Sequence, residues 1–362
     1  MKLKTILLTL VFANFAGIIL RAEEASKINA RYGINFSAPK DWNRMQAFLN
    51  AMKMSRAWTS QSGDKWDDGQ KLALDENGYV TKLEPGQRAL TIMFTELGDK
   101  FPSGEYVLLY DGDGDFDWKG IATLKKTEKG RQIVEVATSQ NGFVQMILTR
   151  VNPDNYPKNM RFVKAEFEKD LETKNFSPWV FELWKDAKTI RYMDMMLTNN
   201  SNQVEWSERP KPSDRTYSIK GIPIEEIIHL SKLSNTNPWV NIPFHANDEY
   251  VRQMAIMLRD GIPSGLTTYY ELSNEVWNGI FKQTRDSEKL GSELNLATEK
   301  WKAGLMYYSK RCSEIFAILD EVYKEKPKTN YRKVIATQAA NIGVTRIVLE
   351  SYEVYKKTDS LA

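Results

Sequence analysis

Short apolar runs alternate with helical patterns over much of the chain. We interpret the runs as buried strands because they are rich in β-branched and aromatic residues. They lie at residues 32–36, 54–58, 189–196, 238–244, 267–272 and 333–339. Helical spacing of apolar residues is found at 45–52, 224–228, 251–258, 285–324 and 342–355. Strands that alternate with helices predict a parallel sheet of the α/β class.

The helical pattern is absent between residues 61 and 165. Turn signals crowd this stretch, among them Asn77-Gly78, Pro85-Gly86 and Asn141-Gly142, and strand-like runs lie between them. We therefore predict a small antiparallel β domain at 61–165, inserted into an α/β domain made of residues 30–60 and 178–362. The inserted domain either carries carbohydrate contacts at its edges or has a purely structural role.

The amino terminus has the pattern of a leader. Lys2 and Lys4 precede a mostly apolar run at 6–20, and Arg21-Ala22 follows it. This predicts a signal peptide at 1–22 and a secreted or periplasmic protein of bacterial origin. A membrane anchor is the weaker alternative because the run falls short of the roughly 20 apolar residues that a spanning helix needs. We expect no membrane partner once the leader is removed.

Composition limits the classes of partner. The 50 Lys and Arg residues nearly balance the 47 Asp and Glu residues, so charge implies no nucleic-acid partner, while the sequence pI of about 8.6 tolerates a mildly acidic substrate. Ten Trp and sixteen Tyr residues are available. Exported proteins often stack such rings against sugars, although core packing accounts for most aromatic residues.

Few residues are available for metal or thiol chemistry. The single cysteine, Cys312, lies on an apolar helical stripe and is expected in the core, and two histidines cannot build a three-histidine zinc site. The acidic run 111–117 resembles a calcium loop, but Phe116 and Ala122 stand where such a loop needs Gly and Glu. We therefore expect a hairpin turn there, no metal and no cofactor.

Polar residues follow the apolar strand at 267–272 directly, in the sequence TTYYELSNEVWNGIF. A carboxylate and an amide at the carboxyl end of a parallel strand usually lie in the mouth where ligands bind. Glu275 can then serve as a general acid, and Asn274 can bind a substrate hydroxyl. In the alternative, Ser273 or Asn274 caps a helix whose first turn contains Glu275.

Asn274-Glu275 within YYELSNEVWN resembles the acid/base strand of the clan-A glycoside hydrolases. These are retaining enzymes on a (β/α)8 barrel. The longer string ELSNEVWN is similar to large secreted bacterial proteins described as cellulose-binding or cellulase-like. The resemblance implies that Glu275 is the acid/base, that Asn274 binds the sugar 2-hydroxyl, and that a Glu on a later strand is the nucleophile.

Other residues near the predicted strand ends are expected to meet around the same mouth, because a barrel brings those ends together. Each has loop capping or a salt bridge as its alternative role. The candidate substrate contacts besides Asn274 are Trp58, Asp194, Asn199, Trp206, Arg209, His245, Asp248 and Trp277.

The strand count is short of a closed barrel. Six barrel strands are predicted where eight are needed, so we expect a barrel-like fold that is incomplete at its carboxyl end and lacks the nucleophile. The clan places Asn-Glu on its fourth strand, whereas this count places it on the fifth. The predicted function is a glycoside hydrolase-like protein acting on a poly- or oligosaccharide. The alternatives are a non-catalytic carbohydrate-binding protein and an exported structural or interaction protein.

Overall fold

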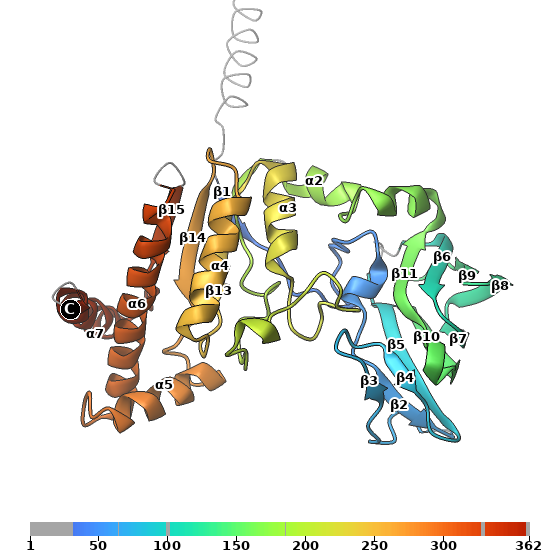
Figure 1. The fold of residues 1–362 in the computed structure, drawn as a ribbon, viewed down its shortest axis with the longest axis horizontal. Coiled ribbons are helices and arrows are strands. Elements are labelled where there is room, and N and C mark those ends of the chain that lie inside the picture. Colours follow the sequence, from blue (N-terminus) through green and yellow to red (C-terminus); the bar gives the residue numbers. More distant parts are fainter. Residues whose placement is uncertain (1–31, 64, 99–101, 185, 327–329, 360–362) are drawn as a thin grey trace, which may run out of the picture.

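The computed structural model describes residues 32–359 apart from 64, 99–101, 185 and 327–329. The predicted signal peptide at 1–22 lies outside the described residues. The described chain forms a mixed α/β structure with one parallel sheet and separate antiparallel sheets (Figure 1). We call the parallel sheet and its helices the α/β part, and the antiparallel sheets the β part.

The α/β part is built on a five-stranded sheet in which every neighbouring pair is parallel. Its strands, in spatial order, are β1 (Tyr32–Asn35), β12 (Ala187–Arg191), β13 (Asn237–Ile242), β14 (Thr267–Leu272) and β15 (Asn330–Val334). The helices are α2 (Pro178–Trp184), α3 (Ile224–Ser234), α4 (Asp248–Gly261), α5 (Lys282–Glu293), α6 (Lys300–Lys324) and α7 (Ile342–Asp359). Spatial order follows chain order, although the connection from β1 to β12 contains the whole β part.

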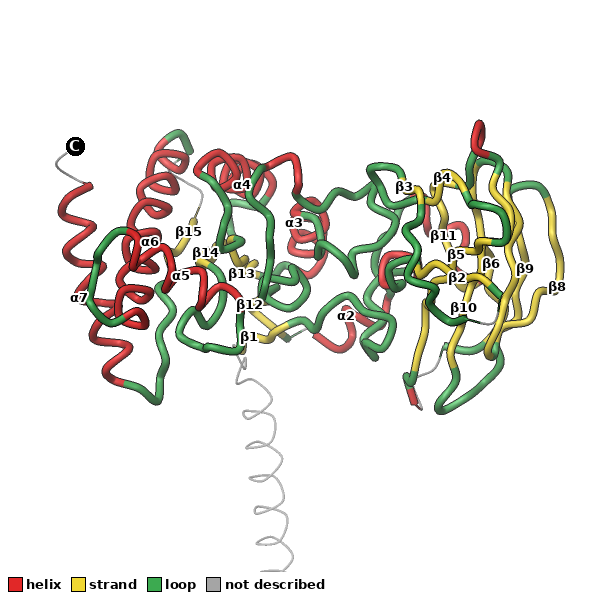
Figure 2. Tube along the Cα trace, turned by 90° about the horizontal axis from the view of Figure 1, so that it is seen from below, coloured by secondary structure: helices red, strands yellow, loops and turns green. Residues whose placement is uncertain are grey.

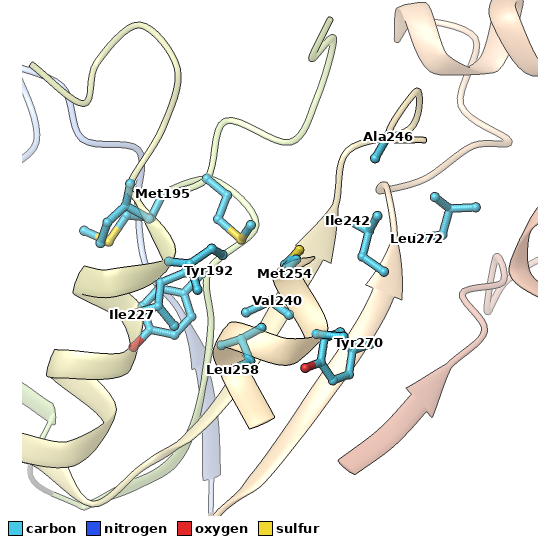
Figure 3. Close-up of a cluster of buried hydrophobic side chains, with 14 of the residues drawn as sticks. Tyr192, Met195, Ile227, Val240, Ile242, Ala246, Met254, Leu258, Tyr270 and Leu272 are labelled. Carbon is cyan, nitrogen blue, oxygen red and sulfur yellow. The ribbon is translucent and has the colours of Figure 1, made fainter. Parts of the chain in front are cut away.

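The two faces of this sheet differ in chemistry. On one face, Val240, Ile242, Tyr270 and Leu272 pack against helices such as α4, which contributes Met254 (Figure 3). Figure 2 shows α3 and α4 on one side of the sheet and α6 at its end, beside β15. Successive side chains of a strand point to opposite faces, so the residues between these form the second face. That second face is only partly buried along β1, β12 and the first half of β13 and β14.

The β part contains two four-stranded antiparallel sheets and a small hairpin. One sheet has the order β2-β5-β10-β7, the other β11-β6-β9-β8, and β3 pairs with β4. The bounds are β2 (Thr59–Ser62), β3 (Ala73–Leu74), β4 (Val80–Lys82), β5 (Gln87–Thr95), β6 (Gly104–Asp111), β7 (Gly114–Gly120), β8 (Ala122–Glu128), β9 (Arg131–Val136), β10 (Phe143–Val151) and β11 (Lys158–Lys164). Its own core includes Phe162, which stacks on Tyr106 and Trp118.

The segment before β2 corrects two predictions. Residues 54–58 form no strand of the parallel sheet: a short 3-10 helix, η1 (Ala51–Met54), precedes them, and Arg56 hydrogen-bonds through its N–H to Ile92 of β5. Residues 45–52 form no amphipathic helix either. Asn43 caps the N–H of Met45, Asn50 caps η1, and Phe48 bridges to Phe176, so these apolar side chains enter the core from turns.

No closed barrel is present in the part of the chain that the structure describes; its parallel strands form an open sheet. None of the described helices is long and apolar enough to cross a membrane.

Candidate functional site

The turn that follows β14 has an unusual backbone. Ser273 and Glu275 have φ values of 56° and 42°, in the left-handed region that residues with a side chain rarely adopt. No helix begins there, because α5 starts only at Lys282. The alternative that Ser273 or Asn274 caps a helix is therefore wrong.

A buried ion pair lies directly before this turn. Arg191, at the end of β12, donates from Nε and Nη2 to both carboxylate oxygens of Glu271 on β14, at 2.8–2.9 Å. Trp239 of β13 also donates from Nε1 to Oε2 of Glu271, at 2.8 Å. Burial raises the pKa of Glu271, and the positive charge of Arg191 and these hydrogen bonds oppose that rise.

The ion pair continues into an amide network. Arg191 Nη2 donates to Oδ1 of Asn274 at 3.1 Å, and Asn274 Nδ2 donates to Oδ1 of Asn199 at 3.1 Å. Gln283 of α5 donates to Asn199 Oδ1 and to the carbonyl oxygen of Asn274, at 2.8 and 2.9 Å. We call Arg191, Trp239, Glu271, Asn274, Asn199 and Gln283 the edge network. It leaves one of the two amide N–H groups of Asn274 for another partner.

Glu275 lies beside this network and is less buried than Asn274. Its Oε2 accepts a hydrogen bond from Asn278 Nδ2 at 2.9 Å. Trp277 is partly buried and packs against the core of the α/β part. The Glu275 carboxylate forms no ion pair with the described residues, so it can accept further hydrogen bonds from a ligand.

The open face of the sheet contains a cavity of about 400 Å³ that includes Asn35, Arg191, Trp239 and Tyr269 in its lining. Trp239 and Tyr269 are paired in register across β13 and β14, with ring centroids 5.7 Å apart and planes 25° apart. Both rings are partly exposed. The two ring planes are nearly parallel, and the guanidinium of Arg191 lies over the Trp239 ring at 5.5 Å from its centroid. These partly exposed rings form an aromatic floor of the cavity that offers apolar contact to a ligand.

Two buried oxygen atoms near the turn lack partners. Asn241 Nδ2 donates to the carbonyl oxygen of Ser273 at 2.7 Å, but Asn241 Oδ1 and Ser273 Oγ find no hydrogen-bond partner among the described residues. Buried polar atoms are nearly always paired, so an unpaired group calls for a physical explanation.

Two more predicted residues lie on neighbouring loops. His245, which follows β13, contacts Oδ2 of Asp286 through Nε2 at 2.8 Å, and Lys282 bridges to the same carboxylate at 2.9 Å. Asp194 follows β12 and is partly exposed, with no hydrogen bond to its side chain in the described part of the chain. Burial raises the pKa of Asp194, and the nearby charge of Arg191 opposes that rise.

Three predicted contacts are engaged around the start of α4. Arg209 pairs with Glu225 of α3 at 2.8 Å and lies over the ring of Trp206. Asp248 pairs with Arg311 at 2.7 Å. Arg209 and Asp248 therefore have the salt-bridge role that is the alternative to substrate contact.

Trp58 is placed elsewhere. It packs against the core of the β part, donates to the carbonyl oxygen of Gly78 at 3.1 Å, and lies under the guanidinium of Arg215. The expectation that it follows a barrel strand was wrong, because its segment joins the antiparallel sheet through β2.

The sequence interpretation missed Glu271, Trp239, Tyr269 and Gln283. The sequence contained a signal for Trp239, Tyr269 and Glu271. Trp239 alternates with apolar residues along one strand, and Tyr269 and Glu271 do so along the next, so the three side chains are expected on one face of the sheet. A carboxylate inside such a strand is seldom buried without a partner, so Glu271 was a marker of a polar inner face.

No group of three or more His, Cys, Asp or Glu side chains able to hold a metal ion occurs within the described ranges. In the acidic run, Asp113 and Asp115 are both paired with Arg150. Cys312 is buried on α6, and burial raises the pKa of its thiol to about 12.

Comparison with protein-family models, with curated proteins and with solved structures finds no match to this chain.

Proposed function

We propose that this protein is a glycoside hydrolase-like protein that takes a poly- or oligosaccharide at the carboxyl edge of its parallel sheet. One observation carries the proposal: β14 is the fourth parallel strand in chain order, after β1, β12 and β13. Asn274 and Glu275 therefore follow the fourth strand, which is where the clan-A glycoside hydrolases place their Asn-Glu pair. The discrepancy of one strand arose from residues 54–58, which belong to no parallel strand.

In this proposal the open sheet is part of a barrel-like architecture and the leader directs export. Glu275 protonates the glycosidic oxygen and later activates water. The edge network holds Asn274 by two of its polar atoms, so its remaining N–H can meet a sugar hydroxyl. We assign no nucleophile.

A non-catalytic carbohydrate-binding protein is the second candidate, and the Arg191–Glu271 pair favours it. A retaining mechanism needs a second carboxylate about 5 Å from the acid/base. Glu271 is the carboxylate of the edge network, and it is already neutralised by Arg191. The Trp239–Tyr269 floor supports binding in either case.

The two candidates are separated by pairing a binding assay with a reducing-end assay on a panel of soluble and insoluble polysaccharides. Trp239→Ala tests the aromatic floor, and Trp301→Ala, an exposed Trp on α6, is its matched control. Glu275→Gln tests the acid/base.

A hydrolase releases reducing ends, and Glu275→Gln abolishes this while binding persists. A binding protein releases none, and its binding is lost in Trp239→Ala but kept in Trp301→Ala and Glu275→Gln. If the wild-type protein neither binds nor cleaves any polysaccharide of the panel, the proposal fails.

A further inference from the structure

A second cavity lies where the α/β part meets the β part. It has a volume of about 500 Å³ and is lined by residues of η1, of β11, of the loop 212–217 and of α3. We call it the seam cavity. Its size is typical of ligand pockets, and boundaries between structural units are a common place for them. It is separate from the cavity over Trp239, with which it shares no lining residue.

The seam is held in a fixed shape by the loop 212–217. Thr216 donates through its hydroxyl to the carbonyl oxygen of Ser55 at 2.6 Å, and the buried Arg215 donates to Ser55 Oγ and to the carbonyl oxygen of Arg56, both at 2.8 Å. Tyr217 donates through its N–H to the carbonyl oxygen of Lys53 at 2.8 Å. These contacts join both parts of the molecule around the cavity.

Two cations in the cavity wall form no ion pair with a carboxylate in the part of the chain that the structure describes. Lys53 Nζ donates to the carbonyl oxygens of Pro212 and Asp214 at 2.8 and 2.6 Å and lies over the Tyr217 ring. Arg161 on β11 is exposed, and its guanidinium forms no hydrogen bond or ion pair with another described side chain. An anionic group bound here would meet one free Lys donor and the planar guanidinium fork.

Two carboxylates in the same wall accept hydrogen bonds from neutral groups, and His229 Nδ1 lies 3.9 Å from one of them, Glu226. Glu226 of α3 is buried and accepts from Asn175 Nδ2 at 2.9 Å and from the Tyr217 hydroxyl at 3.2 Å. Asp111 accepts from Asn159 Nδ2 at 2.7 Å. Carboxylates with spare lone pairs accept hydrogen bonds from hydroxyl groups, and they repel a bare inorganic anion.

From this pattern we propose that the seam cavity binds an acidic saccharide, with its carboxylate at Arg161 and Lys53 and its hydroxyls at Glu226 and Asp111. A sugar acid is the ligand that presents both an anion and several hydroxyl donors. The class of ligand, a saccharide, rests on the proposed function. The anion requirement rests on the cavity alone.

Lys53 makes the binding pH-dependent. Desolvation lowers its pKa to about 8, against the opposing charges of Glu226 and Asp214, and the Arg215 charge lowers it further. Only the ammonium form attracts the ligand carboxylate. The association constant therefore falls about tenfold between pH 7 and pH 9 as Lys53 loses its proton.

The test is calorimetric titration of the full chain with trigalacturonic acid. Neutral galactotriose and sodium sulfate serve as comparison ligands. We expect trigalacturonic acid to bind at least about tenfold more tightly than either, since a charge-assisted hydrogen bond lost from the complex costs about that factor. Arg161→Gln and Lys53→Met should each weaken binding by a similar factor.

Arg346→Gln, an exposed Arg on α7, is the matched control and should leave the affinity unchanged. Arg161 is exposed, so its replacement tests the site even where Lys53→Met disturbs the seam. Equal affinity in the wild type and Arg161→Gln overturns the proposal, as does sulfate binding as tightly as the sugar acid.

Trp239→Ala separates this proposal from the function at the sheet edge. Binding of trigalacturonic acid that survives in Trp239→Ala supports the seam site, whether or not the edge binds or cleaves any sugar. Binding that is lost in Trp239→Ala and kept in Arg161→Gln places the ligand at the sheet edge and overturns the seam site.

Discussion

Replacement of Arg191 by Met should destabilise the parallel sheet, because the buried charge of Glu271 then has no cation to offset its desolvation. The side chain of Glu271 is 3% exposed and that of Arg191 is 17% exposed, so the pair is largely shielded from water. Removing one partner of a buried pair typically costs about 3–5 kcal/mol, because the remaining charge loses its compensation. We expect about 3 kcal/mol at neutral pH, the lower end of this range, because Trp239 continues to donate to Glu271.

The cost should depend on pH with a definite sign. Burial already raises the pKa of Glu271, and loss of the Arg191 charge raises it further. The folded variant then keeps a proton that the unfolded chain releases, so its stability falls as pH rises from the ordinary Glu pKa through the folded pKa. The deficit against the wild type should be small near pH 4 and full at neutral pH.

Hydrogen exchange measured on peptides of β12 and β14 is the appropriate assay, because a chain of this size need not unfold in one step. The matched control is Lys188→Met, an exposed residue on the same strand. The double variant Arg191→Met with Glu271→Gln should recover part of the loss, since Gln has no charge to desolvate. An Arg191→Met variant no less stable than Lys188→Met, or one whose deficit does not grow with pH, would refute this reasoning.

Three further outcomes are expected. Gly221→Ala should lose about 2 kcal/mol or more of local stability, because φ is +96° and the new Cβ would lie 2.3 Å from the carbonyl oxygen of Met196. Hydrogen exchange of the surrounding peptides is the assay, and Gly265→Ala, with open space around it, is the control. Gln283→Leu should lose about 1–3 kcal/mol in the same assay, since the buried carbonyl oxygen of Asn274 loses the donor that Gln283 supplies. Cys312 should resist a thiol reagent at pH 8 until denaturant is added, because its pKa is raised to about 12 and it is buried; rapid labelling of the native protein would contradict this.

The sequence largely predicted where strands of the α/β part lie. It did not predict which sheet each extended segment joins. Residues 238–244 and 267–272 show the apolar alternation that the structure turns into β13 and β14. Residues 54–58 show a similar run, yet the chain there pairs with β5 through Arg56 and Thr59. A local pattern states that a segment is extended and buried. It does not state which strand will supply its hydrogen bonds.

The candidate site was predictable to the extent that its residues follow strands. Glu275 and Asn274 stand out because polar groups end an apolar run, and Asn199 was found for a similar reason. Gln283 lies within a helix and reaches the site only because α5 folds back against the turn. Nothing in the local sequence encodes that approach, which is set by tertiary packing.

The left-handed backbone of Ser273 and Glu275 has a cost in stability that glycine would avoid. A left-handed residue other than glycine costs about 1–3 kcal/mol. The chain places glycine at many of its left-handed positions, including Gly78 and Gly130, where the turn alone is required. At Ser273 and Glu275 it does not, and the hydrogen bonds of the edge network to Asn274 hold the turn in place between them. A turn with only a connecting role would gain stability from glycine at 275. Seven other described residues with side chains, Leu197 and Asn200 among them, also have positive φ, so this conformation alone assigns no role to Glu275. Glu275→Gly should therefore stabilise the turn, and the proposed role of the carboxylate is tested by its effect on a ligand.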